Sequence, residues 1–336
     1  MSGKLSIGIM GTGNIARQFA AGVNSSARCT LAAVGSRSAE TAAKFAADFS
    51  VPVSHASYDA LLQDKSVDAI YISLPNTLHH EWTIKALHHG KHVLCEKPLA
   101  CSLREAIEMF DAAKSANRVL IEAFMYRAHP QTQAILDTIQ SGEIGSVKLV
   151  RSSFCYRVRQ WAGNVRFNKS LAGGSLMDVG CYCIDFSNLI AGGEPTDVHA
   201  VARIHETGVD EQTSVVMKYA SGITAEFTCG MMVQQDNTAA ICGDEGYITT
   251  GWPWKPGQGN SKFDICHSIP PRQDATQKAG LSPRRTIEVP VSHPLYAIEA
   301  DAFASAVFYE AQAFVTPEQS LASARVMDKL RQQIAK

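Results

Sequence analysis

The stretch His92-Val93-Leu94-Cys95-Glu96-Lys97-Pro98 is an apolar run that ends in an acid, a base and a proline. A buried strand that stops at a charged pair and a rigid turn is how an open α/β sheet presents reactive groups at its carboxyl edge, where such sheets bind ligands. Taken alone, Lys97 could equally be a surface lysine that follows a strand. We predict that it is the chemical centre, because a dinucleotide-binding pattern precedes it and a charged helix with a tyrosine follows it.

Asp178 and Tyr182 stand four residues apart, in a helical pattern that begins after Gly173-Gly174. This spacing predicts that a carboxylate and a phenol share one helix face. A phenol near the Lys97 ammonium would have a lowered pKa, and could serve as acid and base for a carbonyl and alcohol pair. We therefore predict Lys97, Tyr182 and Asp178 as catalytic residues. The alternative for Tyr182 is a core aromatic whose hydroxyl bonds to the backbone.

A glycine turn, Gly11-Thr12-Gly13-Asn14-Ile15-Ala16, follows an apolar run and opens a helical pattern. Strand, glycine turn and helix are the context that a dinucleotide-binding fingerprint requires. Gly11 permits the tight turn, Gly13 lets the backbone approach a pyrophosphate, and the helix amino terminus faces the phosphates. We predict cofactor contacts from Gly11, Thr12, Gly13, Asn14 and Ile15.

The residues after the second strand indicate which dinucleotide is bound. An acid at this position would bond to the ribose hydroxyls of NAD, but the sequence here is Gly35-Ser36-Arg37-Ser38. Arg37 could pair with a 2′-phosphate through its planar fork, and Ser36 could donate a hydrogen bond to it. We therefore predict NADP(H) as the cofactor; the alternative is that Arg37 is a solvated loop residue.

Further cofactor contacts are predicted at the same sheet edge, from Leu74, Pro75, Asn76, His79, Glu96 and Lys97. For His79, contact with cofactor or substrate and a structural role are equally favoured. Asn76 could instead cap the helix that follows.

The substrate side is predicted from aromatic and polar residues near the expected cleft between two domains. Tyr126 and Arg127 should border that cleft, and Asp178, His79 and Arg127 should orient substrate hydroxyls. Phe154, Trp161 and Trp254 are candidates for an apolar wall against a ring.

Residues 1–124 alternate between strand and helix patterns, which predicts a Rossmann domain with a doubly wound parallel sheet. The predicted strands are Leu5–Met10, Thr30–Val34, Ala69–Leu74, His92–Cys95 and Val119–Phe124, and helices fall at Ala39–Phe49, Thr77–His89 and Leu103–Ala116.

Residues 125–336 predict a C-terminal α+β domain with an open-faced, mainly antiparallel sheet. Strands are expected at Val147–Val158, Val198–His205, Thr213–Tyr219, Thr224–Met231, Thr238–Cys242, Tyr247–Thr250, Phe263–His267 and Arg285–Val289, and helices at Gln131–Gln140, Tyr296–Tyr309 and after Thr316. Pro270–Pro283 is expected to be a surface excursion. A partner subunit could cover the open sheet face, so we predict a homodimer.

Composition excludes several other classes of protein. The 336 residues include 31 Lys and Arg against 32 Asp and Glu, so a nucleic-acid partner is not indicated. No apolar run reaches membrane-spanning length and no leader precedes the first strand, which predicts a cytoplasmic protein without a membrane partner. The nine cysteines lack paired metal spacing, and we predict no metal site.

These motifs in this order resemble the glucose-fructose oxidoreductase, inositol dehydrogenase and rhizopine catabolism (Gfo/Idh/MocA) family. The matching segments are the Gly11–Ala16 turn, Glu96-Lys97-Pro98, and Gly173-Gly174 through Asp178 to Tyr182. The resemblance implies an open-faced sheet used for association, Lys97 and Tyr182 as catalytic residues, Asp178 as a substrate-positioning residue, and Arg37 as a 2′-phosphate contact.

The stretch from Glu122 to Arg127, with Asp-x-Gly-x-Tyr, is similar to the dimeric dihydrodiol dehydrogenases and NADP-dependent xylose dehydrogenases. Many other relatives carry His at the position of Tyr182, so inositol specificity is not implied. We predict hydride transfer between NADP(H) and a hydroxyl carbon of an aldose, such as xylose or glucose, or of a cyclic trans-dihydrodiol. The alternatives are a sugar–sugar oxidoreductase, lyase or glycosidase with a retained cofactor, and a regulator without catalysis, which the presence of Lys97 and Tyr182 disfavours.

Overall fold

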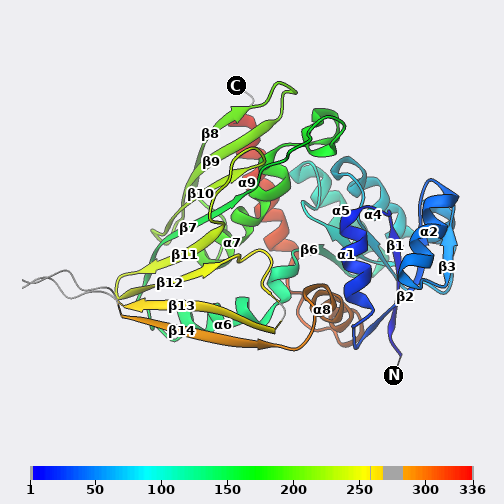
Figure 1. Ribbon diagram of the computed structural model, residues 1–336, viewed down its shortest axis with the longest axis horizontal. Helices are drawn as coiled ribbons and strands as arrows, with labels where there is room; N and C mark the ends of the chain where they lie inside the picture. Colours follow the sequence, from blue (N-terminus) through cyan, green and yellow to red (C-terminus); the bar gives the residue numbers. More distant parts are fainter. Residues whose placement is uncertain (1–2, 258, 268–282, 335–336) are drawn as a thin grey trace, which may run out of the picture.

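The computed structural model describes residues 3–257, 259–267 and 283–334. The predicted excursion at Pro270–Pro283 therefore lies outside the described residues, except for Pro283. Two sheets dominate the arrangement, one from each half of the chain, with helices between them (Figure 1).

The first half forms a six-stranded parallel sheet in the order β3-β2-β1-β4-β5-β6, which confirms the predicted doubly wound fold. Its strands are β1 (Leu5–Met10), β2 (Cys29–Gly35), β3 (Val53–His55), β4 (Ala69–Ile72), β5 (His92–Glu96) and β6 (Leu120–Ala123). The helices are α1 (Asn14–Val23), α2 (Ala39–Phe49), α3 (Tyr58–Gln63), α4 (His79–His88) and α5 (Leu103–Ala116). The strand order reverses between β1 and β4, and sheets of this kind bind ligands beyond the strand ends at such a point.

The central strands are buried because helices cover both faces of this sheet. All four residues of β4 are buried, as are Val93, Leu94 and Cys95 of β5, and this is why their sequences are continuous apolar runs. The sequence predicted neither β3 nor α3. The three-residue β3 has two exposed positions, so it carries no apolar pattern that could mark it as a strand.

The second half forms an eight-stranded sheet in the order β14-β13-β12-β11-β7-β10-β9-β8. The β7 and β10 strands pair in parallel and all other neighbours are antiparallel, as predicted for a mainly antiparallel sheet. The strands are β7 (Val147–Cys155), β8 (Asp197–Ile204), β9 (Asp210–Lys218), β10 (Thr224–Gly230), β11 (Thr238–Gly243), β12 (Gly246–Gly251), β13 (Gly259–His267) and β14 (Arg284–Val291). The β7 strand ends three residues before the predicted Val158, and Arg157 then makes an isolated bridge to Met232.

Helices lie on the face of the large sheet that is turned toward the first half (Figure 1). They are α6 (Pro130–Gln140), α7 (Cys181–Ala191) and α9 (Pro317–Ile334), while α8 (Leu295–Tyr309) packs against α1. No described element covers the opposite face, and Val201 and Val216 are 79% and 54% exposed there. This is the open-faced sheet that the sequence predicted.

The α9 helix connects the two halves. It contacts α5 of the first half and α7 and β8 of the second. The Leu103 amide donates to the Asp328 carboxylate at 2.9 Å, and the Gln333 amide donates to the Val198 carbonyl at 2.8 Å. These contacts hold the carboxyl edge of the parallel sheet against the helices of the second half, which is where Lys97 and Tyr182 lie.

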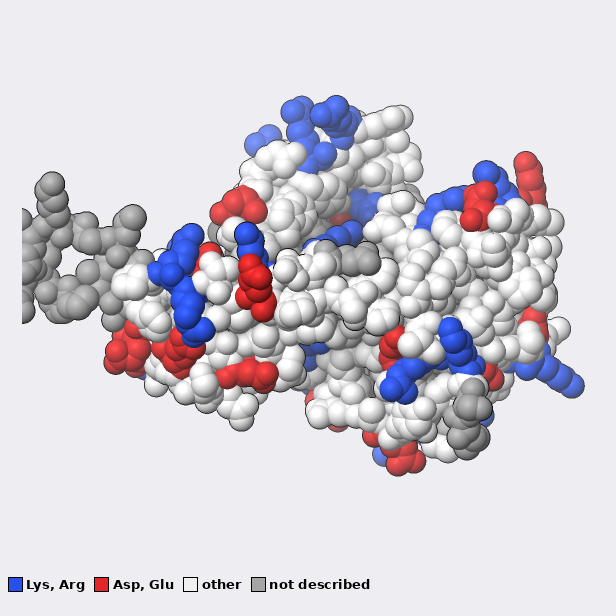
Figure 2. Space-filling model, turned by 60° about the horizontal axis from the view of Figure 1, so that its bottom comes forward, with Lys and Arg blue, Asp and Glu red and all other residues white. Residues whose placement is uncertain are grey.

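Acidic and basic side chains are interspersed over most of the face in Figure 2, apart from one group of basic side chains at the top of the view. Among the described helices, none is long and apolar enough to cross a membrane.

Candidate active site

Lys97 follows β5 at the carboxyl edge of the parallel sheet and reaches into the second half of the molecule. Its ammonium donates to the Asp178 backbone carbonyl at 2.8 Å and lies 4.8 Å from the centroid of the Tyr182 ring. The three residues predicted to be catalytic are therefore adjacent, although they come from segments about 80 positions apart in the chain.

Asp178 lies in a π-helical turn, Leu176–Gly180, rather than in a regular helix. In this wider turn the Cys181 amide donates back to the Leu176 carbonyl, and the Asp178 carbonyl is presented to Lys97. The two glycines before the turn are required by close contacts. An added Cβ would lie 2.3 Å from the Arg166 carbonyl oxygen at Gly173 and 2.1 Å from an Asp210 oxygen at Gly174.

The Asp178 carboxylate is held by two residues that the sequence did not predict. The Tyr156 hydroxyl donates to one oxygen, and the Arg166 Nε lies 3.0 Å from the other. Burial by itself would raise the pKa of Asp178, but Lys97, Arg166 and Tyr156 outweigh burial and hold it below its usual range. Asp178 is therefore ionised near neutral pH.

A sequence signal for Arg166 did exist. The stretch 156–177 contains four basic residues and no acidic residue, in a chain that is otherwise almost neutral. The basic residues are Arg157, Arg159, Arg166 and Lys169. One further cation, Lys255, lies close enough to Lys97, Glu96, Asp178 and Arg166 for their charges to act on its pKa.

Tyr182 is almost fully buried, in a cluster of aromatic rings that includes Phe124, Phe154 and Trp254. Its hydroxyl lies 3.3 Å from the Met125 sulfur. The expectation that Lys97 lowers the pKa of Tyr182 is wrong: burial raises that pKa well above its ordinary value. The phenol is thus a neutral acid at physiological pH.

The expectation that Phe154, Trp161 and Trp254 form an apolar wall against a substrate ring is also corrected. Phe154 and Trp254 stack with centroids 5.7 Å apart, and the Trp254 indole donates to the Ser153 carbonyl at 2.9 Å. Both rings are buried and pack against the Tyr182 ring, so they belong to the core around Tyr182 rather than to a wall that faces the substrate. Trp161 packs elsewhere, against Phe167 and His205.

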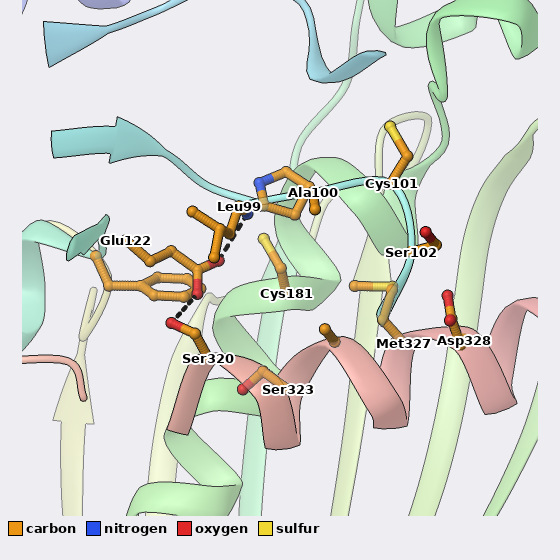
Figure 3. A pocket seen from close by; sticks show the side chains of 13 residues that line it. Leu99, Ala100, Cys101, Ser102, Glu122, Cys181, Ser320, Ser323, Met327 and Asp328 are labelled. Atoms are coloured by element: carbon orange, nitrogen blue, oxygen red, sulfur yellow. Dashed lines mark hydrogen bonds between the residues drawn. The ribbon is translucent and has the colours of Figure 1, made fainter. Parts of the chain in front are cut away.

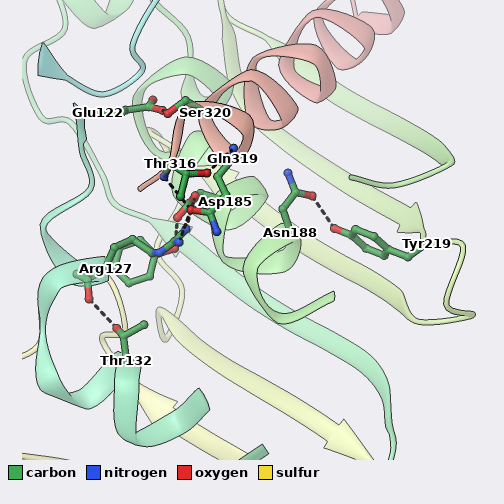
Figure 4. A network of polar contacts seen from close by, with 10 residues as sticks. Glu122, Arg127, Thr132, Asp185, Asn188, Tyr219, Thr316, Gln319 and Ser320 are labelled. Carbon is green, nitrogen blue, oxygen red and sulfur yellow. Dashed lines mark hydrogen bonds and ion pairs between the residues drawn. The ribbon is translucent and has the colours of Figure 1, made fainter. Parts of the chain in front are cut away.

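Tyr126 and Arg127 do not border a substrate cleft. Both side chains bind Asp185, which is buried on α7: the Tyr126 hydroxyl donates to one oxygen, and Arg127 pairs with the other at 2.8 Å (Figure 4). Arg127 also donates to Gln319 of α9 at 2.8 Å. A buried carboxylate needs such partners, so these residues are committed to joining α7 and α9.

The glycine turn fits a dinucleotide. Gly11 has a φ of +104°, and an added Cβ would lie 3.2 Å from the Ser73 carbonyl oxygen, whereas a Cβ on Gly13 would meet nothing within 4 Å. Gly13 caps α1 without any side-chain bond, and the first turn holds no acidic residue. The amide groups of this helix end therefore face open space that an anionic pyrophosphate could fill. The neighbouring Thr12, Asn14 and Ile15 are exposed or half-buried.

After β2, the two residues predicted to contact a 2′-phosphate differ. Ser36 is buried, its hydroxyl shares a 2.7 Å hydrogen bond with Thr41 and accepts from the Ser38 amide, so it stabilises the turn and is not a free donor. Arg37 is exposed beside Tyr58, as a phosphate ligand would be.

Three other residues with predicted cofactor contacts, His79, Asn76 and Glu96, have structural partners. His79 is buried, and its ring nitrogens meet the Pro98 and Leu74 carbonyls at 2.9 and 2.8 Å, so it has no nitrogen left for a ligand. The Asn76 amide donates to the Ala172 carbonyl at 3.0 Å.

The Glu96 carboxylate is turned into the core, where the Tyr71 hydroxyl donates to it and burial raises its pKa. Leu74 and Pro75 lie in the turn between β4 and α4, where the Leu74 side chain approaches Gly11.

A small, mainly apolar cavity lies between the Pro98–Ser102 segment, Cys181 and α9 (Figure 3). Glu122 closes one side of it. The Glu122 carboxylate accepts from the Leu99 amide at 2.9 Å and from the Ser320 hydroxyl at 2.6 Å, so it links the turn after Lys97 to α9. Burial raises the pKa of Glu122 to about 7. In the described residues there is no cluster of three or more His, Cys, Asp or Glu that could hold a metal.

A parallel sheet with a glycine turn suited to a phosphate, joined to an open-faced sheet whose covering helices carry Tyr182 and Asp178 next to Lys97, defines a dinucleotide-binding protein of two parts. Comparison with known proteins gives the family. Residues 5–124 match the oxidoreductase family with an NAD-binding Rossmann fold, and residues 132–249 match the GFO/IDH/MocA C-terminal domain. The chain belongs to the GFO/IDH/MocA family of oxidoreductases, as the sequence motifs predicted.

Two relatives are named as dehydrogenases. A D-xylose 1-dehydrogenase (NADP(+)) of Haloferax volcanii is 41% identical over 65% of this chain and 67% of its own length. The trans-1,2-dihydrobenzene-1,2-diol dehydrogenase of Xenopus laevis is 34% identical over 79% of this chain and 82% of its own. Among solved structures, a 3-ketoreductase from Actinomadura kijaniata with NADP and TDP-benzene superposes with a TM-score of 0.86, at 28% identity over 98% of both chains.

The bridging carboxyl of Glu122 gives a prediction for stability against pH. Because its pKa in the folded protein lies above the ordinary 4.5, ionisation disfavours the folded state, and stability should fall as pH rises from about 4.5 to about 7. Glu122→Gln keeps the shape without the charge and should be more stable than the wild type at pH 8, by up to about 3 kcal/mol, with little difference at pH 4.5. Urea unfolding at both pH values measures this. The exposed Glu288→Gln is the control, and a difference that does not change with pH would contradict the prediction.

Proposed function

We propose that this protein transfers a hydride between NADP(H) and a hydroxyl-bearing carbon of an aldose or a cyclic trans-dihydrodiol, with Tyr182 as acid and base and Lys97 as its assisting cation. One observation carries the proposal: the Lys97 ammonium lies 4.8 Å from the centroid of the Tyr182 ring, and within the described residues the Tyr182 hydroxyl donates to the Met125 thioether, a weak acceptor. A substrate oxygen would replace that contact at little cost. The nearby hydroxyls of Tyr71, Tyr126 and Tyr156 all donate to carboxylates instead.

The chemistry follows from the charges around the phenol. In the reducing direction Tyr182 gives its proton to the substrate carbonyl oxygen, and in the oxidising direction it takes the hydroxyl proton back. The Lys97 ammonium, fixed by the Asp178 carbonyl over the ring, stabilises the negative charge that develops on the phenol oxygen. Bound NADP(H) supplies the hydride donor or acceptor.

The substrate class is inferred from the relatives and from Asp178. A xylose dehydrogenase and dihydrodiol dehydrogenases are named for substrates with hydroxyls on neighbouring carbons. The ionised Asp178 carboxylate stands next to Lys97 and could accept a hydrogen bond from a hydroxyl adjacent to the reacting carbon.

Replacement of the acid and base tests the reaction. With NADP⁺ and D-xylose, D-glucose or a trans-dihydrodiol of benzene, the wild type should reduce the nicotinamide with at least one substrate. Tyr182→Phe keeps the ring and should lower turnover by roughly 10²- to 10⁴-fold, because it removes only the proton donor. NADPH affinity, followed by fluorescence, should not change. Wild-type turnover in Tyr182→Phe would exclude Tyr182 as the acid and base.

The cofactor assignment has its own test at Arg37. An exposed guanidinium after β2, with no acid beside it, favours the 2′-phosphate of NADP(H). Arg37→Ala should weaken NADPH binding about tenfold or more and leave NADH binding unchanged, because only NADPH carries that phosphate. Arg104→Ala on α5, also exposed, is the matched control. Equal wild-type affinities for NADPH and NADH would contradict the assignment.

We also propose that the protein is a homodimer that pairs through the open face of the eight-stranded sheet. That face carries the exposed Val201 and Val216 on neighbouring antiparallel strands, and both line a groove that crosses β7 to β11. Multi-angle light scattering should give twice the 36.3 kDa of one chain. Val216→Arg should shift the mass toward the monomer, whereas Val53→Arg in the first half should not. A monomeric wild type would contradict the proposal.

A further inference from the structure

Asp178 makes two separate sets of contacts. Its backbone carbonyl accepts from Lys97, while its carboxylate accepts from Tyr156 and pairs with Arg166. Within the described residues, Lys97 makes no ion pair with this carboxylate, although it lies close enough to lower the pKa of Asp178. The strongest acceptor next to Lys97 is thus bound by other residues.

The segment that carries Arg166 is attached directly to the turn that presents Asp178. The Gly174 amide donates to the Arg166 carbonyl at 2.9 Å, and the Gly173 amide donates to the Asn168 carbonyl at 3.0 Å. At its end, the Ala172 carbonyl accepts from Asn76 of the first half. The Arg166 backbone is therefore fixed relative to Asp178, within reach of the carboxylate that its half-exposed guanidinium pairs with.

The surrounding charges show what the carboxylate would do without Arg166. Lys97, after β5, is its largest charge partner, followed by Arg166, and the Tyr156 hydroxyl from β7 adds a hydrogen bond. Lys255, between β12 and β13, is also near enough for its charge to interact with that of Asp178. With Arg166 removed, Lys97 would be the strongest remaining cation, and a direct carboxylate–ammonium pair would form.

We propose that Arg166 and Tyr156 are positioning residues that act through Asp178: they hold its carboxylate, so that the Lys97 ammonium stays on the Asp178 carbonyl and over the Tyr182 ring. This inference rests on the proposed function, because it explains how Lys97 remains available to assist Tyr182. A lysine paired with the carboxylate would be drawn off the ring, and its charge would be partly neutralised.

The kinetic test uses D-xylose and NADP⁺ with four variants. Arg166→Met should lower kcat by roughly 10- to 100-fold, since it displaces a catalytic group. Arg166→Lys should recover part of the loss, and Tyr156→Phe should give a smaller loss. NADPH affinity should stay unchanged in all of them. Lys169→Met removes an exposed cation from the same segment and should behave as the wild type.

A double-mutant cycle separates action through Asp178 from direct contact with the substrate. If Arg166 acts through the carboxylate, Arg166→Met should have little further effect in an Asp178→Asn background. Losses that multiply in the double variant would show that Arg166 works independently of Asp178, and would overturn the inference.

A measurement without substrate keeps the inference distinct from the proposed reaction. Acetic anhydride labels free amines, and peptide mass spectrometry gives the rate at Lys97 in the NADPH-bound protein. A new ion pair with Asp178 should slow labelling of Lys97 several-fold in Arg166→Met, and not in Lys169→Met. An unchanged rate in Arg166→Met would overturn the inference. A slowed rate in a protein that oxidises none of the sugars would support it and count against the proposed substrates alone.

Discussion

The hydrogen bond from the Lys97 ammonium to the Asp178 carbonyl is the contact on which the site depends. It joins the carboxyl edge of the parallel sheet to a π-helical turn of the second half, so neither half contains the site alone. The double glycine before Asp178 allows that turn to approach Arg166 and Asp210 closely, and α9 holds the segment after Lys97 through Glu122.

Buried carboxylates organise the polar interior around that contact. Glu96, Glu122 and Asp185, which are buried, and Asp178, which is partly buried, each accept from hydroxyl, amide or guanidinium groups of other segments, and this offsets the cost of desolvation. Tyrosine hydroxyls donate to three of these four carboxylates, whereas the Tyr182 hydroxyl contacts the Met125 thioether. Burial raises the pKa of the Tyr182 phenol, so the phenol stays neutral, and its proton is not held by a carboxylate.

Several residues expected at a substrate cleft instead belong to this buried polar interior. Tyr126 and Arg127 looked suited to a cleft because aromatic and cationic residues follow the last strand of the first half. Their partner, Asp185, is more than 50 positions away, and no local pattern indicates that a buried carboxylate will meet them. For His79 the sequence does not distinguish ligand contact from a structural role, because its two backbone partners become neighbours only after folding.

The sequence by itself determined the two sheets and the glycine turn, because strand and helix periodicities and turn glycines act over a few residues, and it singled out Lys97, Asp178 and Tyr182, which the structure brings together. It also indicated Arg37, since a missing acid after β2 is a local fact. Only the tertiary structure decided that Asp178 presents its carbonyl to Lys97, that Tyr156 and Arg166 hold its carboxylate, and that burial raises the pKa of Tyr182. Those outcomes depend on desolvation and on charges brought together from distant segments, and such terms exist only once the chain is packed.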